Sequence, residues 1–387
     1  MPLDTIYLTR HGHRLNWTID YKTGTYHAQF PTPTGNPADP TLTSHGVRQS
    51  HELAAHLTSD SIHPKPFRVY CSPFYRCLQT IQPSVEALKA LHQRTCSNDG
   101  TSPTPPTEST IEPHADFDVR IENGLGEWFG HTTFFEHPQP APHSILATHF
   151  PTLLPLPPAT SPPPSARDRG GDLFSSSMPP PTPHVIPSPT GETIAQLHDR
   201  VATALSGILA DVDAEIAALE AAQPAHEPRS SKAILICSHA APLIAMGRAL
   251  TGHMPPDPNT EDFAVFTAGL STFRRRRRRR RRGESGEQGD ASPGSHAEVP
   301  LLARGTKVLR TGTTVPEWRG GKGVAGGWDC VRNGDCGFLS QGAERGWHFD
   351  GEEGFDTGPM APEEAGPTSS LDIMASADGA GERGTKL

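Results

Sequence analysis

The sequence predicts an α/β fold, a three-layer sandwich with a mostly parallel central sheet. Three runs, at 6–8, 67–71 and 233–237, are apolar except for Arg68 and have the pattern of buried strands. Apolar residues recur at intervals of three and four over 194–216, which is the pattern of an amphipathic helix. Strands that alternate with helices are typical of a parallel sheet covered by helices. The functional site of such a fold lies at the carboxyl ends of its strands.

The first half of this fold is expected to contain two strand and helix units. After the first apolar run, residues 43–59 have the pattern of a helix, with Thr43 or Ser44 as its N-cap. After the second, a helix is expected over about 73–92, where the proline at its start suits a first helical turn. Residues 118–121 have the pattern of a further short strand.

The second half repeats the alternation. The long amphipathic helix begins after 191–192, and the third apolar run is followed by a helix that carries apolar residues over 243–250. Residues 263–273 are expected to form a closing strand.

Composition divides the chain into a globular part and polar segments. The 41 prolines and 37 glycines gather outside the periodic stretches. We therefore expect one domain over 1–273 with a Pro-rich insertion at 138–190, an Arg-rich and polar linker at 274–303, and a largely disordered tail that contains glycine and tryptophan at 304–387.

The formal net charge of −9 argues against a general nucleic-acid binder, which needs an excess of lysine and arginine on one face. One local exception is the run of arginines at 274–282. It is read as a solvated linker, as a nucleic-acid or nuclear-targeting segment, or as an artefact of the gene model, and these alternatives stay open.

Cysteine spacing and hydropathy predict the compartment. The six cysteines show no spacing of a zinc ribbon or redox pair, so reduced thiols are expected. The first strand begins almost at the N-terminus and leaves no room for a signal peptide, and no apolar run reaches the ~20 residues of a membrane span. A cytoplasmic or nuclear protein is expected.

Charged and polar side chains follow three of the predicted strands. Arg10 and His11 follow the first, Arg76 follows the second, and His239 follows the third. Two guanidinium groups match the oxygens of a phosphate, and two histidines can supply a nucleophile and a further phosphate donor. A lone histidine after a strand is more often structural, but three strand ends with matching chemistry predict a phosphate pocket.

These residues resemble the histidine phosphatase superfamily, also called phosphoglycerate mutase-like. The resemblance rests on four motifs, which are Thr9-Arg10-His11-Gly12, the Leu-Thr, Gly and Gln pattern of 42–49, the Ser-Pro, Arg and Gln-Thr pattern of 72–80, and Ser238-His239. It implies phosphoric monoester hydrolysis through a phosphohistidine, with His11 as nucleophile and with Arg10, Arg76 and His239 holding the phosphoryl group. No metal and no cofactor are implied.

The resemblance also implies a carboxylic acid as proton donor. Glu127 in the segment 124–128 is the preferred candidate, whereas Glu122 is expected to cap or flank the strand at 118–121. Arg-His-Gly is followed here by His13 and then by residues that the mutases lack, so glycolytic mutase activity is not expected.

A finer resemblance suggests a second class of function. The segments 30–35, 126–130 and 238–242 are similar to a fungal branch related to the tau phosphatase-like subunit of TFIIIC, the RNA polymerase III transcription factor. That branch implies a non-catalytic or weakly catalytic assembly subunit with transcription-complex partners. The three tail tryptophans and the turn-forming Asn333-Gly334 are read either as a docked hairpin or as part of a disordered tail.

Overall fold

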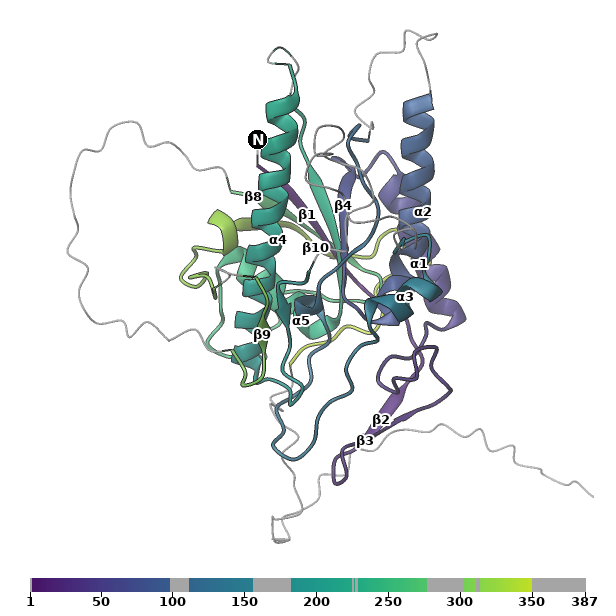
Figure 1. Ribbon diagram of the computed structural model, residues 1–387, viewed down its shortest axis with the longest axis vertical. Helices are drawn as coiled ribbons and strands as arrows, with labels where there is room; N and C mark the ends of the chain where they lie inside the picture. Colours follow the sequence, from purple (N-terminus) through teal and green to yellow (C-terminus); the bar gives the residue numbers. More distant parts are fainter. Residues whose placement is uncertain are drawn as a thin grey trace, which may run out of the picture.

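The computed structural model describes residues 2–97, 111–155, 182–224, 226, 229–276, 302–310 and 314–349. Its centre is a six-stranded sheet with the order β10-β8-β1-β7-β4-β5 (Figure 1). The strands are β1 (Thr5–Arg10), β4 (Pro66–Cys71), β5 (Arg120–Ile121), β7 (Ala233–Ser238), β8 (Leu270–Arg275) and β10 (Trp328–Asp335). Four of them, β1, β7, β4 and β5, pair in parallel, and β8 is antiparallel to both of its neighbours. The α/β class and the mostly parallel sheet are confirmed.

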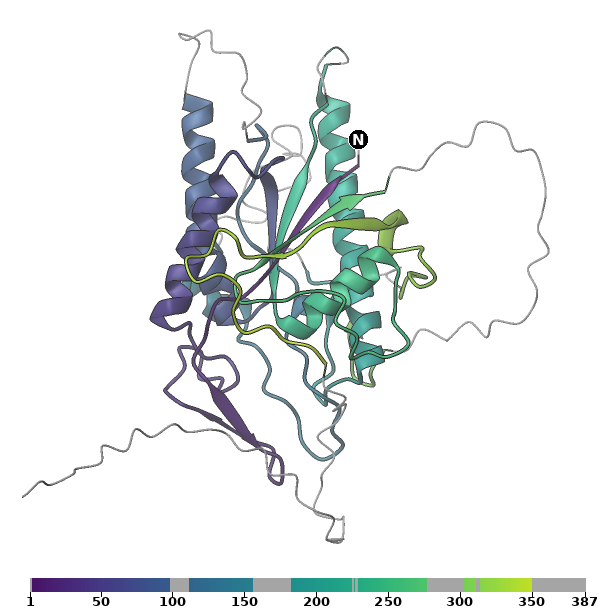
Figure 2. The same ribbon diagram turned by 180° about the vertical axis from the view of Figure 1, so that it is seen from behind.

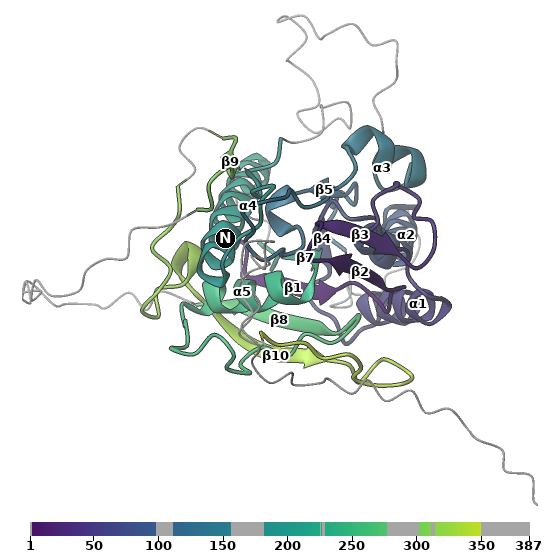
Figure 3. The same cartoon turned by 90° about the horizontal axis from the view of Figure 1, so that it is seen from below.

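Helices cover both faces of the sheet, as the end-on view shows (Figure 3). One layer contains α1 (Ser44–Thr58), α2 (Tyr75–Ser97) and α3 (His143–His149), and the other contains α4 (Ile194–Ala222) and α5 (Ala240–Thr251). Strand β7 shows why both layers form, because Leu235 packs toward α1 and α2 whereas Ile234 and Ile236 pack toward α4 and α5. Successive side chains of a strand point to opposite faces, so one wholly apolar strand supplies two cores.

The smaller elements lie around this sandwich. They are β2 (Trp17–Asp20), β3 (Thr25–Ala28), β6 (Val185–Ile186), β9 (Lys307–Val308) and the 3₁₀ turns η1 (Asn123–Leu125) and η2 (Val324–Gly326). Strands β2 and β3 form a hairpin that projects from the carboxyl-end edge of the sheet (Figure 1).

Local sequence signals account for the helix starts. Thr43 is the N-cap of α1 and its hydroxyl accepts the amide of Gly46, and Thr193 forms a capping box with Gln196 at the start of α4. Gly46 also lets α1 approach the loop after β1, because a Cβ there would lie 2.0 Å from the carbonyl oxygen of His13.

Part of the segment predicted as a Pro-rich insertion is packed. Residues 143–149 form α3, and Leu146, Phe150 and Leu153 are buried in the core beside α2. Residues 156–181, which hold its proline runs, lie outside the described residues.

The closing strand differs from the prediction. It begins at Leu270 rather than at 263, and it continues through Arg275. Ala268 has a left-handed φ of 55°, and its amide donates to the carbonyl of Arg10, so the chain bends before it can pair with β1. Arg275 pairs with Asp213 at 2.8 Å, so the arginine run begins inside the fold; residues 277–282 lie outside the described residues.

The tail packs on the domain as a strand, and the hairpin prediction at Asn333-Gly334 is wrong. These two residues lie inside β10, which adds to the sheet beside β8 (Figure 2). The register shifts between Arg332 and Asp335, and the Asn333 amide bonds to the backbone of the 262–264 loop instead of closing a turn. Residues 350–387 of the expected disordered tail lie outside the described residues.

Two tail tryptophans belong to the main core. Trp318 and Trp328 are fully buried and pack with residues of α4 and α5. The packed unit therefore extends beyond the boundary expected at 273, because these rings need partners that only the sandwich provides.

Replacing Trp328 with alanine should lower the free energy of unfolding by about 3–5 kcal/mol, since a fully buried ring would leave a cavity in the core. Urea denaturation measures the change. Val331→Ala is the matched control, because Val331 lies on the same strand and is 53% exposed. Equal stability of the two variants would show that β10 does not contribute to the core.

Candidate active site

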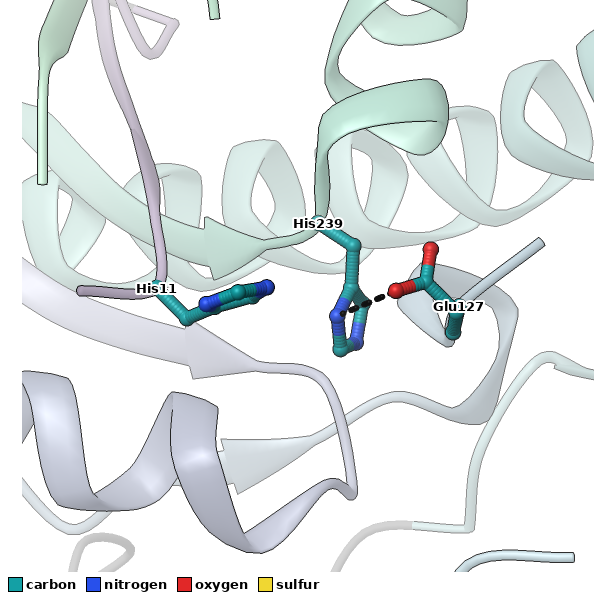
Figure 4. Close-up of side chains that lie close together, drawn as sticks. All are labelled: His11, Glu127 and His239. Atoms are coloured by element: carbon teal, nitrogen blue, oxygen red, sulfur yellow. Dashed lines mark ion pairs between the residues drawn. The ribbon is translucent and has the colours of Figure 1, made fainter. Parts of the chain in front are cut away.

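The predicted site residues meet at the carboxyl ends of β1, β4 and β7. The amide of His11 donates to the carbonyl of Ser238, and the amide of Ser72 donates to that of Cys237. These hydrogen bonds continue the parallel ladder by one residue, so the loops that leave the three strands start side by side. His11 and His239 consequently face each other, with ring centroids 5.3 Å apart (Figure 4).

The His11 ring is buried and held in one tautomer. Its Nδ1 lies 2.9 Å from the carbonyl oxygen of Gly12, which can only accept a hydrogen bond, so Nδ1 carries the proton. Burial lowers the pKa of His11 well below its usual value, and the positive charges of Arg76 and Arg10 lower it further. The ring is therefore neutral, with the lone pair on Nε2.

Glu127 and His239 form the opposite wall. A Glu127 carboxylate oxygen lies 3.3 Å from Nδ1 of His239 and 2.9 Å from the Arg76 guanidinium. Burial alone would raise the pKa of Glu127, but His239, Arg76 and His11 together hold it well below its usual value. The carboxylate is therefore ionised, and the close-up shows it directed at His239 (Figure 4).

Arg76 is fully buried in the first turn of α2 and is fixed by acceptors on two sides. Its Nη1 donates to the Ala38 carbonyl at 2.9 Å and to Asp39 at 3.1 Å, while Nη2 donates to Glu127. Asp39 also accepts the amide of Tyr75 at 2.6 Å and so holds the start of α2. The Nε of Arg76 is buried and has no hydrogen-bond partner among the described residues, so it is an unused donor at the site.

Arg10 lies on the other side of His11. Its Nη1 donates to the carbonyls of Val265 and Arg345, and its Nε is a second buried donor without a partner. Burial and the charges of Arg76 and Arg345 lower the pKa of Arg10 to about 10, although Glu127 opposes them. Two guanidinium groups with unused Nε donors thus flank the nucleophile candidate.

Glu122, the rejected candidate for the acid, has a structural position. It is buried, and its carboxylate accepts the amides of Gly124, His184 and Val185. These bonds cap η1 and hold the loop that carries Glu127. Arg200 of α4 supports the same loop from below by donating to the carbonyls of Gly124 and Gly126.

Two residues of the site were missed by the sequence reasoning. Asp39 orients Arg76, but it lies in an irregular loop whose sequence carries no periodic signal. Arg14 stands four residues after Arg10, and burial with the nearby charge of Arg76 lowers its pKa to about 10. The two arginines at 10 and 14 were a usable signal for a phosphate site. One loop can direct several of its side chains at the same pocket.

One ring nitrogen or carboxylate oxygen from each of His11, Glu127 and His239 lies within 4.8 Å of the others, close enough to hold a metal ion. The surrounding guanidinium groups of Arg10, Arg14 and Arg76 repel a cation and favour an anion. The donor set therefore fits a phosphate group better than a metal.

The family model described as "Histidine phosphatase superfamily (branch 1)" matches residues 6–98, which contain β1, the loop with His11, and Arg76. Over these residues, about a quarter of the chain, the sequence is similar to the histidine phosphatase superfamily.

A curated protein is similar over most of the chain. The transcription factor tau 55 kDa subunit of Saccharomyces cerevisiae is 25% identical over 352 residues, which are 90% of this chain and 59% of that protein. The chain thus spans less than two thirds of the length of this relative.

Solved structures of the superfamily are similar at lower identity. The ecdysone phosphate phosphatase of Bombix mori, in complex with tungstate, has a TM-score of 0.42 and 15% identity, covering 70% of this chain and 88% of that one. A mycobacterial glucosyl-3-phosphoglycerate phosphatase has a TM-score of 0.33 and 16% identity, covering 70% and 90%. Among the described residues, no helix is long and apolar enough to cross a membrane.

The tautomer of His11 gives the superfamily site a direct test. In the substrate-free protein, nitrogen NMR of the histidine rings should show His11 still neutral and protonated at Nδ1 at pH 6.5, where an ordinary histidine is half protonated, since its pKa is lowered. Comparison with His11→Gln assigns the signal. Titration of His11 near pH 6.5, or a proton on Nε2, would contradict the geometry described above.

Proposed function

We propose that the protein is a phosphoric monoester hydrolase that acts through a phosphohistidine at His11. The observation that carries the proposal is the neutral His11 ring, with its Nε2 lone pair free, between two arginines whose Nε donors lack partners. Phosphoryl transfer needs a nucleophile in line with phosphorus and donors placed around the phosphate oxygens. Arg10, Arg76 and His239 would supply these donors.

The first step is attack by Nε2 of His11 on phosphorus while the ester P–O bond breaks. Because Glu127 is ionised in the free protein, the proton needed by the leaving oxygen arrives with the substrate monoanion. Glu127 takes that proton and passes it to the leaving oxygen. The phosphorylated ring is then cationic, and its Nδ1–H remains bonded to the Gly12 carbonyl.

The second step is hydrolysis. Glu127, again ionised, accepts a proton from a water molecule whose oxygen attacks phosphorus. The N–P bond breaks, its electron pair returns to Nε2 of His11, and the proton leaves with inorganic phosphate. Glu127 thus serves both steps, and the cycle needs no metal.

Purified protein should release phosphate from p-nitrophenyl phosphate without added metal, and His11→Ala should lower kcat by at least about 10³-fold because the nucleophile is absent. Stopped assays of inorganic phosphate measure the rate. His253→Ala is the matched control, since His253 is exposed beyond the far end of α5. Turnover retained by His11→Ala would contradict the assignment of His11 as the nucleophile.

Glu127→Gln separates the two steps. With the activated leaving group of p-nitrophenyl phosphate, the variant should still show a burst of nitrophenol of about one equivalent. Steady turnover should be lower by about 10²–10⁴-fold, because water activation needs the carboxylate. The burst is followed by rapid mixing, with detection of the nitrophenolate absorbance at about 400 nm. A variant that loses the burst and keeps its KM would place Glu127 in the first step only.

A second candidate function is assembly within a nuclear transcription complex, with catalysis weak or absent. It is favoured by the similarity to the tau 55 kDa subunit, which covers 90% of this chain rather than only the segment with the nucleophile. Affinity purification from nuclear extract, with His11→Ala beside wild type, tests it. Recovery of the same RNA polymerase III factors by both proteins would support an assembly function independent of turnover.

A further inference from the structure

Six residues of the tail, 344–349, form what we call the C-terminal strap, which contacts both sides of the pocket. On the β1 side, the Arg10 guanidinium donates to the Arg345 carbonyl at 2.6 Å, and the Thr267 amide donates to the Glu344 carbonyl at 3.1 Å. The strap is therefore bonded directly to a residue proposed to hold the phosphate.

The side chain of Glu344 fastens the strap to the loop of the nucleophile. It accepts hydrogen bonds from Gln49 at 3.0 Å and from His45 at 2.5 Å. The same Gln49 accepts the amide of His13 at 2.8 Å. The residues of α1 that matched the superfamily pattern thus link the strap to the loop after β1.

The far end of the strap packs on the residue that follows Glu127. The rings of Trp347 and Phe349 lie 6.3 Å and 5.4 Å from that of Trp128, and Phe349 is buried. The amide of Trp128 in turn donates to Glu127 at 3.1 Å. The strap is thereby held at both ends, on the Arg10 side and on the Glu127 side.

Arg345 stands between these anchors with a strained backbone and an unused side chain. Its φ of 49° is left-handed, a conformation that residues other than glycine rarely adopt. Its side chain is exposed and makes no ion pair or hydrogen bond to another residue of the described part of the chain. Because its carbonyl oxygen accepts the Arg10 guanidinium at 2.6 Å, Arg345 stands beside the pocket, and its charge lowers further the pKa values of Arg10 and Arg14, which burial already lowers.

We propose that Arg345 binds a second anionic group of the substrate, a carboxylate or a phosphate, while the phosphate to be cleaved lies against His11. The inference rests on the proposed function and names its substrate class, a phosphomonoester with a further negative charge. Arg10 and Arg76 already supply donors for one phosphate. The guanidinium of Arg345 is therefore available for a second anionic group of the same substrate. Glycine would remove the strain at 345, and the presence of arginine there is consistent with use of its side chain.

Matched substrates test the proposal in the full-length protein. Phenyl phosphate is compared with 4-carboxyphenyl phosphate, and a phosphoserine peptide with glutamines beside the phosphoserine is compared with its glutamate analogue. Wild type should prefer the charged member of each pair by about fivefold in kcat/KM at low salt, as expected for one partly exposed ion pair. Arg345→Gly and Arg345→Gln should lose the preference for the charged member of each pair.

Arg229→Gln is the matched control, because Arg229 lies just before β7 at the opposite edge of the sheet. A preference that survives in both Arg345 variants, or is absent from wild type that turns over, would overturn the inference while the phosphatase function stands. If wild type hydrolyses no substrate, the proposed function fails, and the inference is then judged by calorimetric binding of the peptide pair. Equal Kd values for the two peptides would overturn it.

Discussion

The arrangement of the pocket depends on one buried charge, the guanidinium of Arg76. A buried cation is stable only when anions and hydrogen-bond acceptors surround it. Asp39 and Glu127 provide the two carboxylates, and Asp39 also holds the start of α2. The same bond to Arg76 places Glu127 against His239. The requirement to neutralise one side chain therefore joins three loops that are distant in sequence.

The balance of charge explains why the pocket suits an anion. Arg10, Arg14 and Arg76 surround His11, whereas Glu127 alone among the described carboxylates lies beside the two histidines. Burial and this excess of positive charge together keep His11 neutral. The positive charge also keeps Glu127 ionised, although burial opposes it. Both groups are thus in the state that the nucleophile and the base need, and an incoming phosphate compensates the remaining charge. The fold creates this state before any substrate binds.

Sequence reasoning reached the parts of the site that follow a periodic element. His11 and His239 each come directly after a strand, Arg76 lies in the first turn of the helix that follows β4, and the register of a parallel sheet brings these strand ends together. Asp39 could not be predicted as a site residue, because it lies in an irregular loop whose sequence has no hydrophobic periodicity to fix its position. For the tail, the sequence left docking and disorder open as alternatives, because a low content of apolar residues predicts disorder whereas tryptophans can anchor a segment. In the structure Trp318 and Trp328 are buried, so the part of the tail that contains them is docked.

In the sequence the predicted site residues all precede 240, whereas the tail follows 273, which suggests that catalysis and partner binding use separate parts of the chain. The structure argues against this division, because the Arg10 guanidinium is bonded to the tail and Trp128 packs on it. The similarity to the tau 55 kDa subunit likewise extends over 352 residues rather than ending with the family match at 98. A partner that bound residues 344–349 would contact the groups that hold Arg10 and Glu127 in place. If both functions operate, they therefore share one surface, and deletion of 274–387 would disturb both.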